Sequence, residues 1–332
     1  EEGLKRSARL GWTQIQNAGG SLEDFDLLKQ IKSEGNLVSR IYYSVSDGEP
    51  ALQLLKEGPQ FDPENMLIVR GIKLYADGAL GSRGAFLLEN YNDFNSKGLL
   101  IFKKEETIPK LIEALNKGIQ IQTHAIGDAA NRITLDWYEE AFKSVSKENR
   151  YIAEPRWRIE HSQNIQVEDT LRFKNLGIIA SMQPSHAIGD LHFAIDRLGL
   201  ERAKNAYLWN SLIKRGVMVI GGSDAPVEIG DPLIEFYAAV TRKDIDGFYS
   251  EGWHLEEAIS RLDALRMFTL WPAFGAFQED IRGSIKVGKL ADLTVFSKDI
   301  ITVEAEEILE AENVLTMVHG DVVFNNLKKR AP

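Results

Sequence analysis

The sequence predicts an α/β fold in which parallel strands are joined by helices. Short apolar runs rich in β-branched and aromatic residues alternate with amphipathic helical stretches between residues 11 and 268, and seven runs of strand type occur before Thr269. Such repeated alternation is typical of parallel strands with helical crossovers. Both a closed (β/α) barrel and an open doubly wound sheet fit the pattern. No G-x-G-x-x-G motif follows the first run, which argues against a dinucleotide-binding sheet.

Each strand prediction rests on a short apolar run, and each helix prediction on apolar residues that recur every three or four positions. The helix over residues 105–117 is the clearest, because Ile108, Leu111 and Leu115 fall on one of its faces. The predicted strands cover residues 11–15, 37–43, 66–75, 119–123, 156–160, 178–182 and 217–221. The predicted helices cover residues 22–33, 51–57, 105–117, 129–144, 167–176, 204–215 and 255–268.

The pattern of the sequence changes after Ile281. The segments GSIKVGKLADLTVF and VLTMVHGDVVFNN alternate apolar residues between glycines, which predicts antiparallel strands with tight turns over residues 283–326. We therefore predict a barrel part over residues 1–282 and a small β part over residues 283–332. The last five residues, KKRAP, are expected to be loose.

Composition restricts the classes of partner. The formal net charge of -10 argues against nucleic acid or an anionic membrane as the main partner, because both need clustered basic residues. The chain has no cysteine, which excludes disulfides and thiolate metal sites. No run approaches the roughly 18 apolar residues of a membrane span, and we expect no secretory leader. We expect a cytoplasmic protein that acts on a small molecule, and self-association into a homo-oligomer is left open.

Four residues with metal-binding or proton-transfer chemistry follow predicted strands. They are Lys73 in GIKLYADG, His124 in QTHAIGD, His161 in RIEHSQ and Asp224 in GGSDAPVE. Taken singly, each has a structural explanation, such as a packed histidine, a turn-capping aspartate or a lysine on the outside of its strand. Taken together, they would converge on one rim of a barrel, where active sites of this fold lie.

Such a set of residues suits metal-assisted hydrolysis. Neutral imidazoles bind divalent ions, and a bound ion lowers the pKa of water toward about 7. A neighbouring carboxylate can take the proton from that water and pass it to the leaving group. A lysine becomes an anionic ligand only if carbon dioxide carboxylates its neutral amine, which requires a depressed pKa.

Longer blocks of the sequence resemble one known family. The blocks GIKLYADGALGSRGAFL, QTHAIGDAANR, RIEHSQ, SMQPSHAIGD, GGSDAPVE and GSIKVGKLADLTVF look like those of amidohydrolase family 3, which includes YtcJ-like and N-substituted formamide deformylase-like hydrolases. The resemblance covers nearly the whole chain. It implies a TIM-type (β/α) barrel beside a small β-sandwich, and a hydrolase of amide-type carbon–nitrogen bonds that uses one or two divalent ions, with zinc as the expected metal.

The resemblance also implies roles for individual residues. It makes His124 and His161 metal ligands and Asp224 both a ligand and the proton-transferring base. Lys73 matches a lysine that is carboxylated in many members of the superfamily. The residues expected to contact substrate are Arg83, Gln183 and His186. Glu160 is expected to face away from the site by strand alternation, and Asp128 to cap the helix that follows it.

One departure from the family pattern affects the metal site. The family places an H-x-H pair on its first barrel strand, and no H-x-H occurs in this sequence. The earliest block, GWTQIQNAGG, matches the second strand, so we expect a chain that lacks the first strand and half of the sandwich. We accordingly expect this chain to bind metal weakly or not at all and to hydrolyse poorly.

Two other functions remain open at this point. A homologue without catalysis could use the scaffold for binding or regulation. A lactonase or esterase could use the same metal site, because substrate selectivity depends on loop contacts that the sequence does not reveal.

Overall fold

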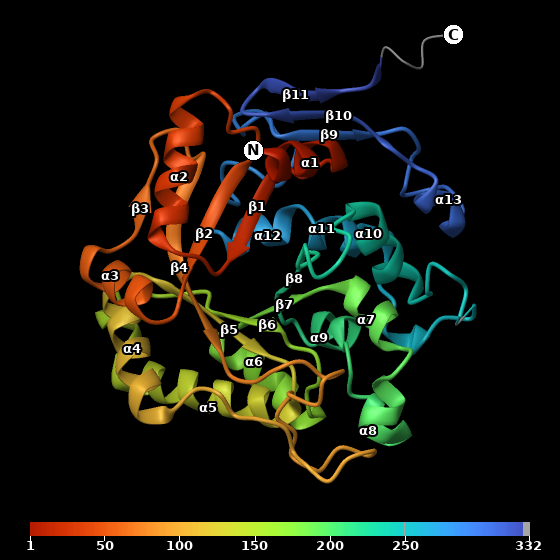
Figure 1. The fold of residues 1–332 in the computed structure, drawn as a ribbon. Coiled ribbons are helices and arrows are strands. Elements are labelled where there is room, and N and C mark those ends of the chain that lie inside the picture. Colours follow the sequence, from red (N-terminus) through yellow and green to blue (C-terminus); the bar gives the residue numbers. More distant parts are fainter. Residues whose placement is uncertain (249, 328–332) are drawn as a thin grey trace.

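The computed structural model describes residues 1–248 and 250–327, so the predicted loose tail of residues 328–332 lies outside the described residues. Its main feature is a curled parallel sheet with helices around it, which confirms the predicted α/β, barrel-type fold (Figure 1). The neighbouring strands are, in order, β1 (Gln14–Ala18), β2 (Arg40–Ser46), β4 (Leu67–Tyr75), β5 (Gln120–Ala125), β6 (Arg158–His161), β7 (Ile179–Met182) and β8 (Val219–Gly221). In the described parts of the chain β1 and β8 are not paired with each other, so the sheet is an open, incomplete barrel. The short β3 (Gln60–Phe61) pairs antiparallel with β4.

Helices surround the outer face of the sheet, as Figure 1 shows. Six helices overlap ranges predicted from the sequence: α2 (Leu22–Ser33), α3 (Glu49–Glu57), α4 (Lys104–Lys117), α5 (Asp128–Ser144), α6 (Thr170–Leu176) and α9 (Trp209–Lys214). The start of α2 has a reciprocal cap, in which the Ser21 side chain accepts the Asp24 N–H and the Asp24 carboxylate accepts the Ser21 N–H. This arrangement satisfies two N–H groups that a helix start otherwise leaves unpaired.

Several helices differ from the sequence prediction. The helix expected over residues 204–215 is confined to α9, and the one expected over residues 255–268 is split into a 3-10 turn, η3 (Leu255–Glu257), and α11 (Arg261–Met267). The chain also contains helices that were not predicted, namely α7 (Pro184–Asp190), α8 (Ala194–Ala203), α10 (Pro232–Thr241), α12 (Leu270–Gly275) and α13 (Ala305–Leu309). Two more 3-10 turns are η1 (Lys147–Asn149) and η2 (Val167–Asp169).

The two faces of the sheet differ in polarity. Ile41, Ile72, Ile121 and Ile159 are at most 3% exposed and belong to the apolar core under the helices. The concave face carries polar side chains that bond to one another, listed here by strand: Gln16 of β1, Tyr42 of β2, Gln120 and Gln122 of β5, and Arg158 of β6. Because side chains alternate along a strand, this polarity also fixes which residues face the inside.

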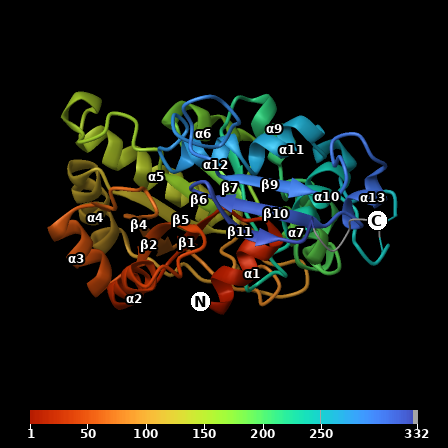
Figure 2. The ribbon, with the colours of Figure 1, turned by 90° about the horizontal axis from the view of Figure 1, so that it is seen from above.

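A small antiparallel sheet near the C-terminus packs against the first helix. Its order is β11 (Asp321–Asn325), β10 (Asn313–Val318) and β9 (Leu293–Phe296). Figure 2 shows its strands next to α1 (Glu2–Leu10), at the opposite end of the sequence. The Thr316 Oγ1 hydroxyl donates to the Ala8 carbonyl at 2.7 Å. The predicted antiparallel strands are therefore confirmed, while the predicted boundary at residues 282 and 283 stays a prediction.

A buried ion pair joins this small sheet to β2. Arg40 is fully buried, and its Nε and Nη2 atoms donate to the Asp292 carboxylate at 2.7 and 3.0 Å. The His319 N–H donates to the same carboxylate at 2.9 Å. This two-point contact fixes the orientation of the small sheet relative to the barrel.

Among the described residues, no helix is both long and apolar enough to cross a membrane.

Candidate metal centre

The strand register brings Lys73 and His124 to the same face of the sheet. Lys73 of β4 pairs with Gln122 of β5, which pairs with Arg158 of β6. Because Gln122 and Arg158 are on the concave face, Lys73 is too, and His124, two residues after Gln122, follows it on the same face. Lys73 is 4% exposed. Both residues therefore point into the mouth at the carboxyl ends of the strands, the end at which parallel barrels bind substrates.

His161 and Asp224 reach the mouth through unusual backbone conformations. Simple alternation after Glu160 would turn His161 outward, but His161 has a φ of 74°. Asp224, in the loop after β8, has a φ of 55°. Positive φ is uncommon for residues other than glycine and costs roughly 1–2 kcal/mol. Strained residues of this kind cluster at functional sites, and here both strained residues contribute side chains to the mouth of the sheet.

Three side chains form a group that could hold a metal ion. The ligand atoms of His161, His186 and Asp224 all lie within 4.8 Å of one another. His186 comes from α7, and its Nε2 is 3.9 Å from Asp224 Oδ2. The group thus draws on the ends of β6 and β8 and on the helix between them. The sequence suggested a substrate contact for His186, and the structure places it among candidate ligands.

His124 lies beside this group but outside the mutual limit of 4.8 Å. Its ring centroid is 4.6 Å from that of His161, and the His161 ring is 5.6 Å from that of His186. The three imidazoles therefore form a continuous row across the mouth. On the side of β4, the Nε2 atom of His124 is 3.5 Å from the Oδ1 atom of Asp77.

Gln183 orients His161. The Gln183 Oε1 atom is 2.8 Å from His161 Nδ1, and a carbonyl oxygen can only accept, so Nδ1 carries the proton. The lone pair of the neutral ring is then on Nε2. A second contact that fixes the tautomer in this way is typical of metal-binding histidines. The sequence predicted that Gln183 contacts substrate, and no contact in the structure tests that role.

The electrostatics keep the imidazoles neutral. Burial is the main cause that lowers the pKa of His124 to about 4, and the charge of Lys73 acts in the same direction. Burial also lowers the pKa of His186 to about 4 and that of His161 well below its usual value. Neutral imidazole is the form that binds a cation.

The charged groups beside the imidazoles have shifted pKa values as well. Burial lowers the pKa of Lys73, although the charges of Glu160 and Asp224 oppose this. Burial also raises the pKa of Asp224, against the effect of Lys73. The pKa of Asp77 is raised by burial to about 7 in spite of three N–H donors to its carboxylate. Opposed shifts of this kind among neighbours are typical of functional sites.

The residues present fit a divalent metal. The Nε2 atoms of His124 and His186 are buried without a hydrogen-bond partner. Unpaired buried nitrogens are costly, and a cation is one group that would satisfy them. The available donors are imidazole nitrogens and a carboxylate, which suit zinc and similar ions.

One residue, Glu160, is placed differently from what the sequence suggested, and the prediction for Arg83 is not tested. Glu160 was expected to face outward, and this is wrong: it pairs with His124 in the register and is 6% exposed on the concave face. The left-handed turn at His161 explains the error, because His161 and not Glu160 departs from alternation. Arg83 forms an ion pair with Asp93 at 2.8 Å in the loop after β4. Its predicted role in substrate binding stays a prediction.

Comparison with known proteins shows similarity to amidohydrolases. The profile of the amidohydrolase family matches residues 1–324. The putative amidohydrolase YtcJ of Bacillus subtilis is 34% identical over 76% of this chain and 46% of that protein. The protein LONG AFTER FAR-RED 3 of Arabidopsis thaliana is 37% identical over 70% of this chain and 41% of that protein. The N-substituted formamide deformylase of Arthrobacter pascens is 28% identical over 78% and 46%.

Solved structures show the same similarity. An uncharacterized metal-dependent hydrolase from Pyrococcus horikoshii OT3 superimposes with a TM-score of 0.78 and 27% identity, over 91% of this chain and 59% of that one. A corresponding protein from Pyrococcus furiosus gives a TM-score of 0.72 and 28% identity, over 87% and 57%. The alignments with the three curated relatives cover 41–46% of those proteins, so this chain spans less than half of their length.

Proposed function

The chain belongs to the amidohydrolase family, and from this premise we propose that it is a metal-dependent hydrolase of carbon–nitrogen bonds in amide-type, non-peptide small molecules. The observation that carries the proposal is the approach of His161, His186 and Asp224 ligand atoms to within 4.8 Å of one another. One relative is by name a deformylase of N-substituted formamides, which supports the choice of bond.

We assign the metal to the mouth of the sheet. Lys73, His124, His161 and Asp224 are the proposed ligands, and zinc is the proposed ion. His186 joins them because its Nε2 is buried, unpaired and close to Asp224. A divalent ion held there would supply Lewis acidity, polarising a substrate carbonyl and acidifying water.

Asp224 is the proposed proton carrier. Burial raises the pKa of its carboxyl group, which makes the carboxylate a stronger base than an exposed one. The carboxylate would take a proton from the attacking water and deliver it to the leaving nitrogen. Gln183 would meanwhile hold the His161 ring through Nδ1, so that the ring does not rotate.

Lys73 is the proposed site of carboxylation. Burial lowers the pKa of its ammonium group, which increases the share of neutral amine. The neutral Nζ would bond to the carbon of carbon dioxide and release one proton, giving an anionic carbamate that can bind cations. Intact-protein mass spectrometry of the native protein against a Lys73→Arg variant measures the added carbon dioxide.

The proposal is tested with the purified chain and added Zn²⁺. N-acyl and N-formyl amines are screened beside lactones and simple esters, with Asp224→Asn as the matched variant. Zinc-dependent release of amine by the wild type, lost in the variant, is the expected result. Because the sequence has no H-x-H pair, we expect weak zinc binding and slow turnover by this chain alone.

The same screen separates the alternatives. Turnover of lactones or esters without amides would replace the proposed function by a lactonase or esterase. Zinc binding without hydrolysis of either class would favour a non-catalytic homologue. Stoichiometric, tightly held zinc would contradict the expected weak binding, and the absence of zinc binding at millimolar concentration would overturn the metal assignment.

A further inference from the structure

A cavity of about 190 Å³ lies between α7 and α10, two helices that pack against each other (Figure 1). Four isoleucines, among them Ile188 of α7 and Ile234 of α10, form its aliphatic walls. The titratable groups that line it are five carboxyl groups and one imidazole, from Glu228, Asp231, Glu235, Asp244, Asp246 and His192. The cavity therefore combines apolar walls with an excess of acidic groups.

This cavity begins next to the candidate metal ligands. Ser185, which lines it, directly precedes His186. Glu228 also lines it, and the Oε1 atom of Glu228 is 3.7 Å from His186 Nε2. The same Nε2 atom is 3.9 Å from Asp224 Oδ2. A substrate whose amide group lies at the metal centre could therefore reach into the cavity through a short chain.

The carboxyl groups of the cavity have few cationic partners. In the parts of the chain that the structure describes, no lysine or arginine forms an ion pair with any of the five. His192 Nε2 lies 2.8 Å from Asp244 Oδ2. The histidine nearest to Glu228 is 3.7 Å away, which is beyond hydrogen-bond distance. Acidic groups gathered without cations disfavour one another's charged form, so a bound cation would stabilise this arrangement.

Two buried side chains of the cavity wall are incompletely satisfied. Glu235 is 1% exposed, and its Oε2 atom accepts the Ser185 N–H at 3.0 Å. Burial, with the charges of Glu228 and Asp231 acting in the same direction, raises the pKa of Glu235 to about 8, although the contact with Ser185 opposes this. Ser185 is 4% exposed, and its Oγ atom is buried without a hydrogen-bond partner. Unsatisfied buried groups are costly, and an ammonium group in the cavity would offer donors to both side chains.

We propose that this cavity binds a protonated amine of the substrate, so that the preferred substrates are amides that carry a second, cationic amino group at the end of a short alkyl chain. The isoleucines would contact the methylene groups, and the carboxylates would accept the N–H groups of the ammonium ion. Hydrogen bonds between charged partners are stronger than neutral ones. The inference rests on the proposed function and names the substrate class of the same site.

Two amides of nearly equal shape test the proposal on the purified chain without metal. N-acetylputrescine ends in an ammonium group, and N-pentylacetamide carries a methyl group in its place. Ligand-observed NMR titrations in the presence of EDTA give both dissociation constants. We expect the cationic amide to bind at least about 10-fold more tightly, which is the contribution of one hydrogen bond to a charged group.

Three variants locate the site. Glu228→Gln keeps the shape of the side chain and removes one charge from the cavity, so the preference for the cationic amide should largely disappear. Asp136→Asn removes one charge from the outer surface, where Asp136 pairs with Arg172, and should keep the preference of the wild type. A Cβ atom at Gly189 would lie 3.8 Å from Glu228 Oε1. The longer side chain of Gly189→Leu should therefore enter the cavity and weaken binding of N-acetylputrescine without a change of charge.

Several results would overturn the inference. They are equal affinity of the wild type for the two amides, no binding of either, a preference that survives in Glu228→Gln, an equal loss of preference in Asp136→Asn, and unchanged binding by Gly189→Leu. Melting temperatures confirm that each variant is folded. None of these results bears on zinc-dependent hydrolysis of other amides. Conversely, a chain that prefers the cationic amide but hydrolyses no amide with zinc would refute the proposed function and leave the binding site in place.

Discussion

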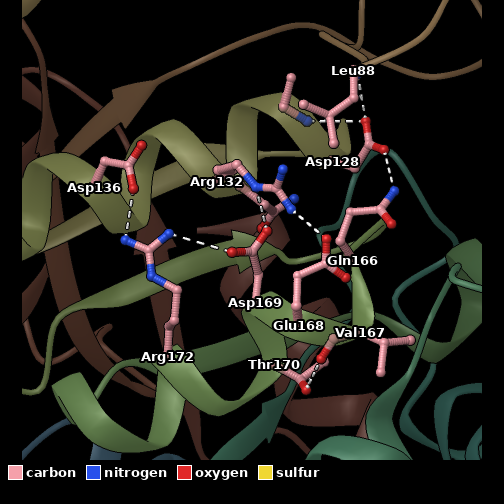
Figure 3. Close-up of polar contacts among 12 residues, drawn as sticks. Leu88, Asp128, Arg132, Asp136, Gln166, Val167, Glu168, Asp169, Thr170 and Arg172 are labelled. Carbon is pink, nitrogen blue, oxygen red and sulfur yellow. Dashed lines mark hydrogen bonds and ion pairs between the residues drawn. The ribbon is translucent and has the colours of Figure 1, made fainter.

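The mouth of the sheet and the outer surface between α5 and α6 differ in how completely their polar and charged groups are paired. On the outer surface, Arg132 donates to Asp169 at 2.7 Å and to Glu168 at 2.9 Å, and Arg172 donates to Asp136 at 2.7 Å (Figure 3). These pairs are partly solvated, and each guanidinium is matched by carboxylates.

In the mouth, polar groups are buried and incompletely matched. The Nε2 atoms of His124 and His186 and the Oε1 atom of Glu160 have no hydrogen-bond partner. A satisfied network is explained by stability alone, whereas unsatisfied buried groups need another reason to persist. The comparison therefore teaches that chemistry is to be sought where pairing is incomplete, and substitutions in each region test this.

The largest effect is expected for Asp224→Asn in the mouth. The amide keeps the shape of the side chain but cannot carry a proton, so turnover should fall by about 10²–10⁴-fold. The rate of amine release at saturating substrate measures this. Asp136→Asn on the outer surface is the control and should turn over like the wild type. Equal losses in both variants would abolish the distinction between the regions.

Asp292→Asn tests a buried ion pair that lies outside the proposed metal site. The change leaves the fully buried Arg40 charge without its anion, and breaking a buried pair in this way costs about 3–5 kcal/mol. Urea unfolding measures the loss, while metal affinity should not change. Weaker metal binding in this variant would mean that the mouth depends on the small sheet.

The same pair predicts a dependence of stability on pH. Burial acts to raise the pKa of Asp292, but the hydrogen bonds and charge of Arg40 outweigh it, so the pKa is lowered on folding. A group with a lowered folded-state pKa stabilises the protein above its unfolded pKa of about 3.9, and this stabilisation is lost as the pH falls through the folded value. Wild type should thus lose stability steeply below about pH 4, and Asp292→Asn less steeply.

Gln183→Leu should have an intermediate effect. It removes the acceptor of the His161 Nδ1 proton, and metal affinity should fall by about 10-fold, at the low end of the range for such partners. Gln183→Glu keeps an acceptor and should bind metal nearly as tightly as wild type. If both variants bind equally weakly, the amide has a role other than accepting that proton.

The smallest effect is expected for Arg172→Ala on the outer surface. Asp169 keeps its contact with Arg132, and partly exposed pairs contribute about 0–1 kcal/mol each. The free energy of unfolding should fall by about 1 kcal/mol, with metal binding and turnover unchanged. A loss of several kcal/mol would show that the ion pairs of Arg172 stabilise the protein more than partly exposed pairs usually do.

The sequence was sufficient to predict the strands and the residues at their ends, because apolar runs and alternation are local properties. It was less informative about helices inside the protein. Helix α10 is buried on more than one side, so its apolar residues show no clear helical stripe. Its start was nevertheless marked by Asp231, whose side chain accepts the Leu233 N–H, and by Pro232 at the first turn.

Within the site, the sequence identified the residue types but not all of their directions. His186 joins the ligand group because Pro184 begins a helix that carries it toward Asp224, and periodicity could not show this. Glu160 and His161 both face the concave side, against the expected alternation, because His161 adopts a left-handed conformation. Such conformations are rare outside glycine, so alternation rules do not anticipate them.

The contact between α1 and β10 has a consequence for biosynthesis. Ala8 is near the beginning of the chain and Thr316 is 308 positions later. At about 5–20 residues per second, the first helix waits on the order of tens of seconds before the strand that completes its packing leaves the ribosome. During that interval its apolar side, including Leu4 and Ala8, is available to chaperones. Folding of this region is therefore expected to finish only after translation has passed β10.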